Sequence, residues 1–420
     1  MKRYSEKIVT LCCFLLVFAN IGLASTSFNV YQPYIVAVPG VGDTGGSIIL
    51  SARTLASFLA MIVVDRYFNV LDMRRGVALA CCMTAVGFAG YAAAATMESF
   101  PLFVASAFVV GVGYGFGGMA AVTILTSRWY VTDVGTAVGV ASVGSGFASI
   151  VIPIVAVRVM QDVSLSSSLL MEGALSAAIA FVVFGLVRNR PSDVGMQPHG
   201  AQDIASGDNS ASEERGEKRG RQKRVRKALP DSPLPITARR ALMVAMALVG
   251  MVSVGGMAYL SVLLASFGFE NMFVAFAISI AGTCLTIAKF ATGELFDHVG
   301  TERGSIIAFA FLVSGFVLCC SAVTGSPIAA IAGAILLGIG ISVGSVGVSV
   351  WSLELSGAQH RTRSIRNSQM AYAFGGFLMN TLPGPLKDLT GSYMVSYAFM
   401  TACAAAAAII IVALYHRYRR

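Results

Sequence analysis

The sequence predicts an all-α membrane protein with about twelve transmembrane helices, arranged as two pseudo-symmetric six-helix halves. Three observations support this fold class: the composition, the apolar runs and an internal repeat. Of the 420 residues, 56% are hydrophobic and 12% are charged, and the mean hydropathy is +0.75. Soluble domains carry about twice that share of charged residues. The chain is therefore expected to lie in a membrane.

The apolar runs set the number of crossings. A helix needs roughly 20 apolar residues to cross about 30 Å of hydrocarbon. Runs of about this length occur at residues 8–30, 45–64, 76–96, 101–126, 134–157, 168–187, 241–266, 271–293, 304–323, 326–351, 367–385 and 393–414. An even number of crossings places both ends of the chain on one side of the membrane.

The two halves repeat each other at an offset of about 230 residues. The run that ends at Asp65 matches the run that ends at Asp297, and Pro153 matches Pro383. Repeats of this kind are typical of secondary transporters, whose substrate site lies between the two repeats. The scaffold residues match, but Lys289 corresponds to Ser57 in the first half.

Charge divides the chain into segments and predicts its orientation. The formal net charge is +9, and nearly all of the 30 Lys and Arg residues fall at the two ends and in alternate loops. The positive-inside rule predicts a plasma (inner) membrane protein with both termini cytoplasmic. The predicted segments are an N-terminal half at 1–187, a cytoplasmic disordered linker at 188–240 and a C-terminal half at 241–420. The basic cluster of the linker is expected to meet anionic lipid headgroups and not nucleic acid.

Enzymatic and cofactor chemistry find no support in the sequence. All eight cysteines fall inside apolar runs and the four histidines fall in predicted cytoplasmic segments, so neither a metal site nor a disulfide framework is predicted. Gly113, Gly115 and Gly118 have the spacing of a dinucleotide-binding loop, but no strand precedes them. We expect a non-enzyme without a cofactor, driven by solute gradients.

Motifs near the repeat anchors resemble a known family. Asp65-Arg66 with Arg74-Arg75-Gly76, its degenerate copy Gly293-Glu294-Leu295-Phe296-Asp297-His298-Val299-Gly300 and the two-half layout resemble the major facilitator superfamily over essentially the whole chain. Further motifs are similar to the oxalate/formate antiporters and monocarboxylate porters: Arg128-Trp129-Tyr130, Gly135-x-Ala137-x-Gly139, Glu354-Leu355-Ser356-Gly357, Asn367, Tyr372-Ala373 and Asp388-Leu389-Thr390-Gly391-Ser392-Tyr393. The resemblance implies a secondary active transporter that moves a small organic anion of the monocarboxylate type by alternating access, with a coupling proton or an exchanged anion.

Three positions depart from that smaller family. Asp133 or Val134 stands where a basic residue is usual, and Phe374 replaces the second cation of oxalate-type members. Leu285 stands where animal-type monocarboxylate porters have an acidic residue. A single central cation suits a monoanion, and proton coupling through an acidic partner at position 285 is not expected.

Lys289 is the first candidate substrate-binding residue. It precedes Asp297 by eight residues, which places it roughly 12 Å into the membrane. A charge at that depth is costly and is usually kept for a pathway or a partner. The resemblance aligns Lys289 with the basic residue that binds a substrate carboxylate. The alternatives are a pair with Glu294 and a snorkelling side chain.

Arg53 and three tyrosines complete the predicted substrate site. Arg53 lies roughly 18 Å along its helix from Asp65 and is expected either to guide anions or to sit at the interface. Tyr31, Tyr114 and Tyr259 offer hydroxyl donors to a carboxylate, although tyrosines near helix ends are often interfacial.

A second group of residues is predicted to gate the conformational change. Asp65, Arg66, Arg75, Asp297 and Arg303 stand at the cytoplasmic ends of matching helices. Ion pairs there are expected to break and re-form as the halves rock, the alternative being a static salt bridge.

Two other functions stay open at this point. One is an exporter of a neutral or cationic metabolite or drug, in which Lys289 would be structural. The other is a transporter-like sensor that uses the 188–240 linker, although this segment lacks the apolar anchors that docking needs.

Overall fold

The computed structural model describes residues 6–130, 134–199, 234–355 and 361–418, and these are almost entirely helical. Eleven helices of this part are long and apolar enough to cross a membrane. The predicted all-α membrane fold is confirmed. The disorder predicted for the linker falls mainly on 200–233, which lie outside the described residues.

The N-terminal half contains the helices up to residue 186, and the C-terminal half begins with α12. The first half comprises α1 (Glu6–Val17), the π-helix η1 (Phe18–Ser27), the 3₁₀ helix η2 (Phe28–Tyr31), α2 (Gln32–Val36), α3 (Gly42–Ile62), α4 (Val64–Leu71), α5 (Met73–Thr96), α6 (Phe100–Gly117), α7 (Met119–Trp129), α8 (Val134–Asp162) and α9 (Leu165–Leu186). The second half comprises α12 (Ile236–Ala258), α13 (Leu260–Ser266), α14 (Asn271–Val299), α15 (Thr301–Ser321), η4 (Ala322–Thr324), α16 (Pro327–Ser342), the π-helix η5 (Val343–Gly347), α17 (Val348–Leu355), α18 (Arg361–Thr381), α19 (Pro383–Thr390) and α20 (Met394–Tyr418). A short 3₁₀ turn, η3 (Pro191–Val194), follows the first half.

Two helix limits differ from the predictions. The predicted span at 367–385 forms α18 and α19, but α18 is not among the eleven apolar helices because polar residues such as Asn367, Gln369 and Asn380 occur along it. The helix α12 begins at Ile236, earlier than the predicted 241, because Pro235 fits the position before a helix and Arg239 and Arg240 extend its first turns.

The first crossing is not a regular α-helix. After Val17 it winds as η1 and then as η2, and Pro33 opens α2. The small and polar residues of η1 give a loose π-helical stretch, a form that occurs mostly at functional sites. This irregular part carries Asn20, Asn29 and Tyr31, which are buried.

Each half is a tight bundle of small residues. Alanine built at Gly250 would place its Cβ 1.9 Å from the Tyr372 carbonyl oxygen, and at Gly375 it would lie 1.9 Å from the Ala247 carbonyl oxygen. The helices α12 and α18 therefore touch backbone to backbone. This is how helices associate where lipid removes the hydrophobic drive.

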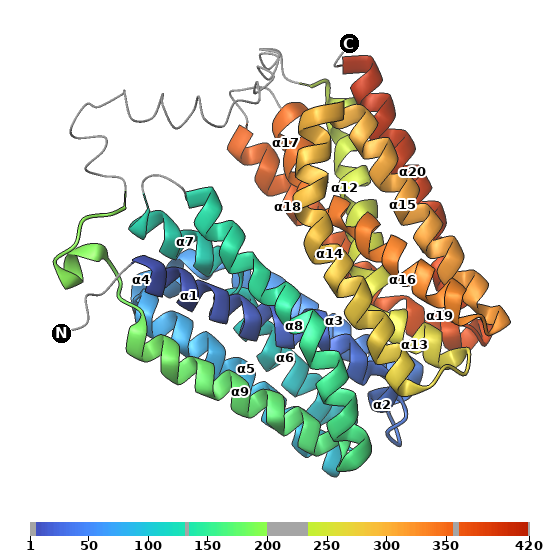
Figure 1. Ribbon diagram of the computed structural model, residues 1–420, viewed down its shortest axis with the longest axis horizontal. Helices are drawn as coiled ribbons and strands as arrows, with labels where there is room; N and C mark the ends of the chain where they lie inside the picture. The colour runs from blue at the N-terminus through green and yellow to red at the C-terminus, as the bar shows by residue number, and fades with distance from the viewer. Residues whose placement is uncertain (1–5, 131–133, 200–233, 356–360, 419–420) are drawn as a thin grey trace.

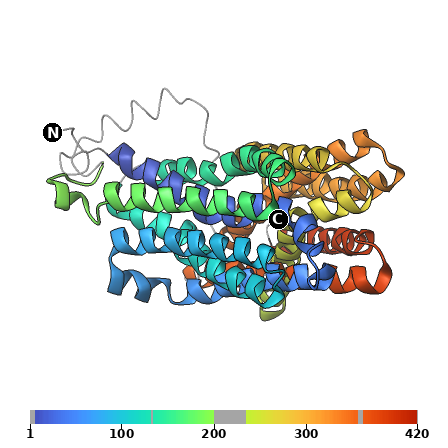
Figure 2. The ribbon, with the colours of Figure 1, turned by 90° about the horizontal axis from the view of Figure 1, so that it is seen from below.

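The two halves touch at one end and separate toward the other. Figure 1 shows the bundles meeting near α2, α3, α13 and α19 and diverging toward α4 and α7 on one side and α17 on the other. Figure 2 shows the same two bundles from below, the N-terminal half at the left and the C-terminal half at the right. We call the first end the joined side and the second the diverging side; α1 begins and α20 ends on the diverging side.

Candidate functional site

Arg53 is a buried cation inside the N-terminal half. It lies on α3 and is 5% exposed. Its Nη1 donates a hydrogen bond to the Ala24 carbonyl oxygen at 2.7 Å, and its guanidinium carbon lies 5.2 Å from the centre of the Phe28 ring. No carboxylate pairs with it within the described residues. Arg53 is therefore enclosed by protein and does not face the outer surface of the bundle.

Phenol groups from both halves lie within electrostatic range of Arg53. They belong to Tyr91 on α5, Tyr114 on α6 and Tyr259, which follows α12. Tyr114 in turn lies near Tyr372 on α18. Predicted site residues Arg53, Tyr114 and Tyr259 thus come together, and the cluster spans both halves.

Lys289 lies elsewhere, on the face of α14 that meets α8. Cβ atoms built at Gly146 and Gly282 would clash with Thr286 and Ser149, respectively, so the two helices touch at these levels. About two turns beyond Gly146 and Thr286, toward the diverging side, Gly139 and Gly293 both face open space. Half-buried Lys289 falls between these levels, where α8 and α14 begin to separate.

Lys289 has no ion pair or hydrogen bond within the part of the chain that the structure describes. The predicted alternative, a pair with Glu294, does not form, and Glu294 is exposed. A Lys at this depth on the separating face is available to a ligand that enters between the halves.

The joined side is held by hydrogen bonds between the halves. The Tyr259 hydroxyl lies 2.8 Å from Ser47 Oγ of the other half, and it donates to the Asn380 carbonyl oxygen of its own half at 2.6 Å. Asn380 Nδ2 donates to Thr54 Oγ1 at 2.7 Å, and Ser51 Oγ lies 2.8 Å from Thr381 Oγ1. These bonds bring α3 against α18 and against Tyr259.

Further contacts extend this joint. The Asn29 side chain donates to the Met257 carbonyl oxygen at 3.2 Å, and Ser261 Oγ donates to the Asn29 carbonyl oxygen at 2.6 Å. At the rim, the Tyr393 hydroxyl donates to Asp43 at 2.6 Å. The centre of the joint thus consists of hydrogen bonds between neutral groups, and carboxylates join it at the rim.

Tyr31 does not share the Arg53 cluster. It is fully buried, and its hydroxyl lies 2.7 Å from Glu172 Oε1 and 2.8 Å from Ser168 Oγ, both on α9. The Phe28 ring separates it from Arg53, since the Phe28 and Tyr31 ring centres lie 5.8 Å apart. Tyr31 is thus also enclosed by protein.

The predicted gating residues lie on the diverging side. Asp65, Arg66, Arg75 and Arg303 are exposed, and none of them forms an ion pair with another described residue. The side chain of Asp297 lies outside the described residues. A static salt bridge among the first four is thus wrong in this conformation, because the halves are apart at this end.

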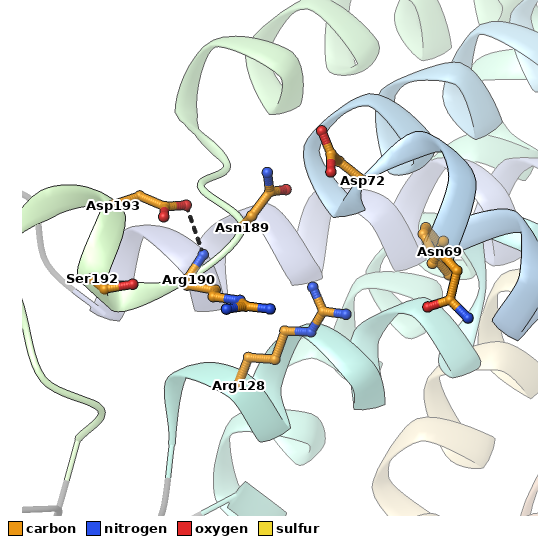
Figure 3. A pocket seen from close by; sticks show the side chains of 8 residues that line it. Asn69, Asp72, Arg128, Asn189, Arg190, Ser192 and Asp193 are labelled. Atoms are coloured by element: carbon orange, nitrogen blue, oxygen red, sulfur yellow. Dashed lines mark hydrogen bonds between the residues drawn. The ribbon is translucent and has the colours of Figure 1, made fainter.

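A polar pocket of about 380 Å³ also opens on the diverging side (Figure 3). It is lined by Phe68, Asn69, Asp72, Arg128, Asn189, Arg190, Ser192 and Asp193. Asp193 Oδ2 accepts a hydrogen bond from the Arg190 backbone N–H at 3.0 Å, and this contact orders η3. The pocket belongs to one half and lies at the end of its helices, away from the Arg53 cluster.

The sequence reasoning missed Glu172, Tyr372 and the joint residue Asn29. Glu172 was detectable, because a carboxyl group inside an apolar run, here the run at 168–187, is a functional candidate by its position alone. Tyr372 and Asn29 carry no charge, and their importance appears only when the two halves are placed together.

Comparison with known proteins agrees with this architecture. The family model of the Major Facilitator Superfamily matches residues 11–380. A search of curated proteins gave no match. The solved structures similar to this chain include a point mutant of the nucleoside transporter NupG (TM-score 0.72, 14% identity, 97% of this chain and 100% of that chain) and a D-xylose-proton symporter (TM-score 0.71, 13% identity, 96% of each chain).

A third similar structure is a bacterial homolog of the human lysosomal transporter Spinster in an inward-facing and occupied conformation (TM-score 0.63, 14% identity, 99% of this chain and 97% of that chain). At these identities the likeness concerns the fold. The family match, together with the two-half membrane architecture, shows that the chain belongs to the Major Facilitator Superfamily and is a secondary transporter.

Proposed function

We propose that this protein moves a small organic anion of the monocarboxylate type, such as lactate, pyruvate or formate, across the plasma membrane by alternating access. The observation that carries the proposal is Arg53: a guanidinium 5% exposed at membrane depth with no carboxylate partner among the described residues. A buried cation without a counter-charge is costly, and a bound anion would offset that cost.

The surroundings of Arg53 support a small carboxylate. Tyr114 adds a hydroxyl group that can donate to an anion, whereas the Tyr259 hydroxyl is taken up by Asn380 and Ser47. Tyr91 and Phe28 provide apolar ring surface. Lys289 supplies the second cation, placed on the face that opens between α8 and α14. We propose that Lys289 draws the anion in and that Arg53 holds it.

The motif resemblance to the oxalate/formate antiporters and monocarboxylate porters supports the same substrate class. With both termini cytoplasmic, as the positive-inside rule predicts, the diverging side faces the cytoplasm and the structure is inward-facing. Asp65, Arg66, Arg75, Asp297 and Arg303 would then pair across the cytoplasmic side when the transporter opens outward.

Counterflow in proteoliposomes tests the proposal. Vesicles loaded with unlabelled pyruvate, lactate or formate should accumulate the labelled acid, and vesicles loaded with uridine or xylose should not accumulate those neutral solutes. Exchange of the neutral solutes without exchange of any monocarboxylate would contradict the proposal and favour a transporter of neutral metabolites.

Arg53→Gln should lower kcat/KM about ten- to a hundredfold, since a hydrogen bond to a charged group contributes roughly 1.5–3 kcal/mol. Arg53→Lys should recover part of this loss. The matched control is Arg158→Gln: Arg158 also lies on a transmembrane helix, but its side chain is 72% exposed and pairs with Asp162 at 3.3 Å. Equal losses in Arg53→Gln and Arg158→Gln would show that the effect is not specific to the site.

A further inference from the structure

Glu172 is a buried acid that the anion site does not use. It lies on α9, seven residues from Leu165, which is about 10 Å from the joined end of the helix. The side chain is 0% exposed. Oε1 accepts from the Tyr31 hydroxyl at 2.7 Å, and Oε2 is buried without a hydrogen-bond partner among the described residues.

The groups around Glu172 do not supply a counter-charge. The element η2 contributes Tyr31, and the facing part of α5 contributes Tyr91, whose hydroxyl has no described partner. On α8 the charged groups are Arg158 and Asp162, which pair with each other at the surface. Near the other end of α9, α1 contributes Cys12 and Cys13 together with Glu6 and Lys7, which have interactions of their own. Arg53 lies on the opposite side of the Phe28 ring.

The hydrogen bonds around Tyr31 accommodate both protonation states of Glu172. When the carboxyl group is ionised, the Tyr31 hydroxyl donates to Oε1. When it is protonated on Oε1, the acid donates to the Tyr31 oxygen, and the Tyr31 hydrogen turns to the Ser168 carbonyl oxygen, 3.3 Å away. A buried carboxylate with an unpartnered oxygen is unfavourable, so the protonated acid is the form that this conformation favours.

The same segment joins Glu172 to the joint between the halves. Tyr31 follows Asn29 by two residues in η2, and Asn29 bonds to Met257 and Ser261 of the other half. Opening of the joined side would break these two bonds and free η2, and Tyr31 could then move away from Glu172.

We propose that Glu172 is a proton-binding site that takes up and releases one proton in each transport cycle, with Tyr31 as its hydrogen-bonding partner. The inference rests on the proposed anion transport: one proton moves with one monoanion, which makes the cycle electroneutral. In this cycle Glu172 takes its proton from the joined side while that side is open, keeps it while Tyr31 covers it, and releases it to the diverging side before the halves return, so that one proton crosses with each anion.

Proteoliposomes with an internal pH-sensitive dye test the transport part. In the wild type, inward movement of the anion should acidify the lumen, and a one-unit pH gradient should drive about tenfold accumulation per proton. Glu172→Gln should lose this accumulation and the dye signal but keep anion counterflow within about twofold, because exchange needs no net proton movement. Asp162→Asn, a surface carboxylate, should behave as the wild type.

Infrared difference spectra between acid and alkaline buffer give a readout that does not depend on the substrate. The wild type in nanodiscs should show the carbonyl band of a buried protonated carboxyl group, which Glu172→Gln removes and Tyr31→Phe shifts. Proton-driven accumulation in Glu172→Gln equal to that of the wild type would overturn the inference, as would an absence of this band. If no monocarboxylate is transported but the band is present, the proposed substrate fails and the proton site stands.

Discussion

Tyr31 and Tyr259 occupy equivalent positions of the two halves, yet their hydroxyl groups have different partners. Both are fully buried. Tyr31 bonds within its own half to Glu172 and Ser168, whereas Tyr259 reaches Ser47 of the opposite half and the Asn380 backbone. The two halves therefore keep tyrosine at this position, but its hydroxyl group has a different role in each half. The N-terminal half carries the buried charges, and the C-terminal half supplies much of the joint.

Both halves use glycines for close helix contacts, and a substitution that disrupts such a contact in the C-terminal half should have the largest effect. Gly250 and Gly375 bring α12 and α18 into backbone contact, and Gly144 brings α8 against the backbone at Phe14 in the N-terminal half. Gly250→Ala should cost about 1–3 kcal/mol or more by overpacking, seen as a lower melting temperature in detergent.

Gly293→Ala is the matched control, since its Cβ would meet open space on a helix. It should leave stability unchanged or raise it by up to about 1 kcal/mol. Wild-type stability in Gly250→Ala would show that α12 and α18 can shift apart.

A second substitution makes the halves alike at the point where their charges differ. Lys289→Ser copies the repeat-equivalent Ser57 and removes the cation on the separating face of α14. We expect KM for the transported anion to rise about tenfold or more, with folding intact. Lys289→Arg should keep most of the activity, and an unchanged KM in Lys289→Ser would exclude Lys289 from the anion path.

Substitutions in the joint between the halves should have smaller effects than those at Gly250 and Lys289. Tyr259→Phe removes one hydrogen bond between the halves, to Ser47, and one within the C-terminal half, to Asn380. The bond between the halves is worth about 1 kcal/mol, so the population open on that side should rise roughly fivefold. Spin-label distances across the joined side measure this population. Tyr397→Phe removes a bond to the Gly256 carbonyl oxygen within the same half and should leave the distances unchanged; the same shift in both variants would contradict the assignment.

The smallest effect belongs to the rim. Asp43→Asn weakens the contact with Tyr393, which is only partly buried, and rim contacts of this kind contribute about 0.2–1 kcal/mol. The same spin-label distances should change less than in Tyr259→Phe. A larger change of the distances in Asp43→Asn than in Tyr259→Phe would show that the rim contributes more to closure than the centre of the joint does.

Much of the frame was predictable from residue patterns. The apolar runs predicted the membrane-crossing helices, because the length and composition of a run are local properties of the sequence. The internal repeat predicted the division into two halves. The predicted span at 367–385 is less apolar than the other crossings. Its helix α18 lies between α3 and α12, where polar residues such as Asn380 find partners that lipid does not offer.

The site was only partly predictable. The depth of Arg53 was derived from helix rise, but its burial depends on Ala24 and Phe28 of another helix. The partners of Tyr31 and Tyr259 lie more than 120 residues away in sequence, and nothing local distinguishes the two tyrosines. Glu172 had a local signal in its depth, and that signal alone would have identified it.

The irregular winding of the first crossing has a kinematic consequence. A π-helix holds more residues per turn than an α-helix, so rewinding η1 by one residue would rotate everything after it by about 100°. Asn29 and Tyr31 both lie beyond η1. One change of winding would therefore turn the residue that fastens the halves and the residue that covers the acid at the same moment.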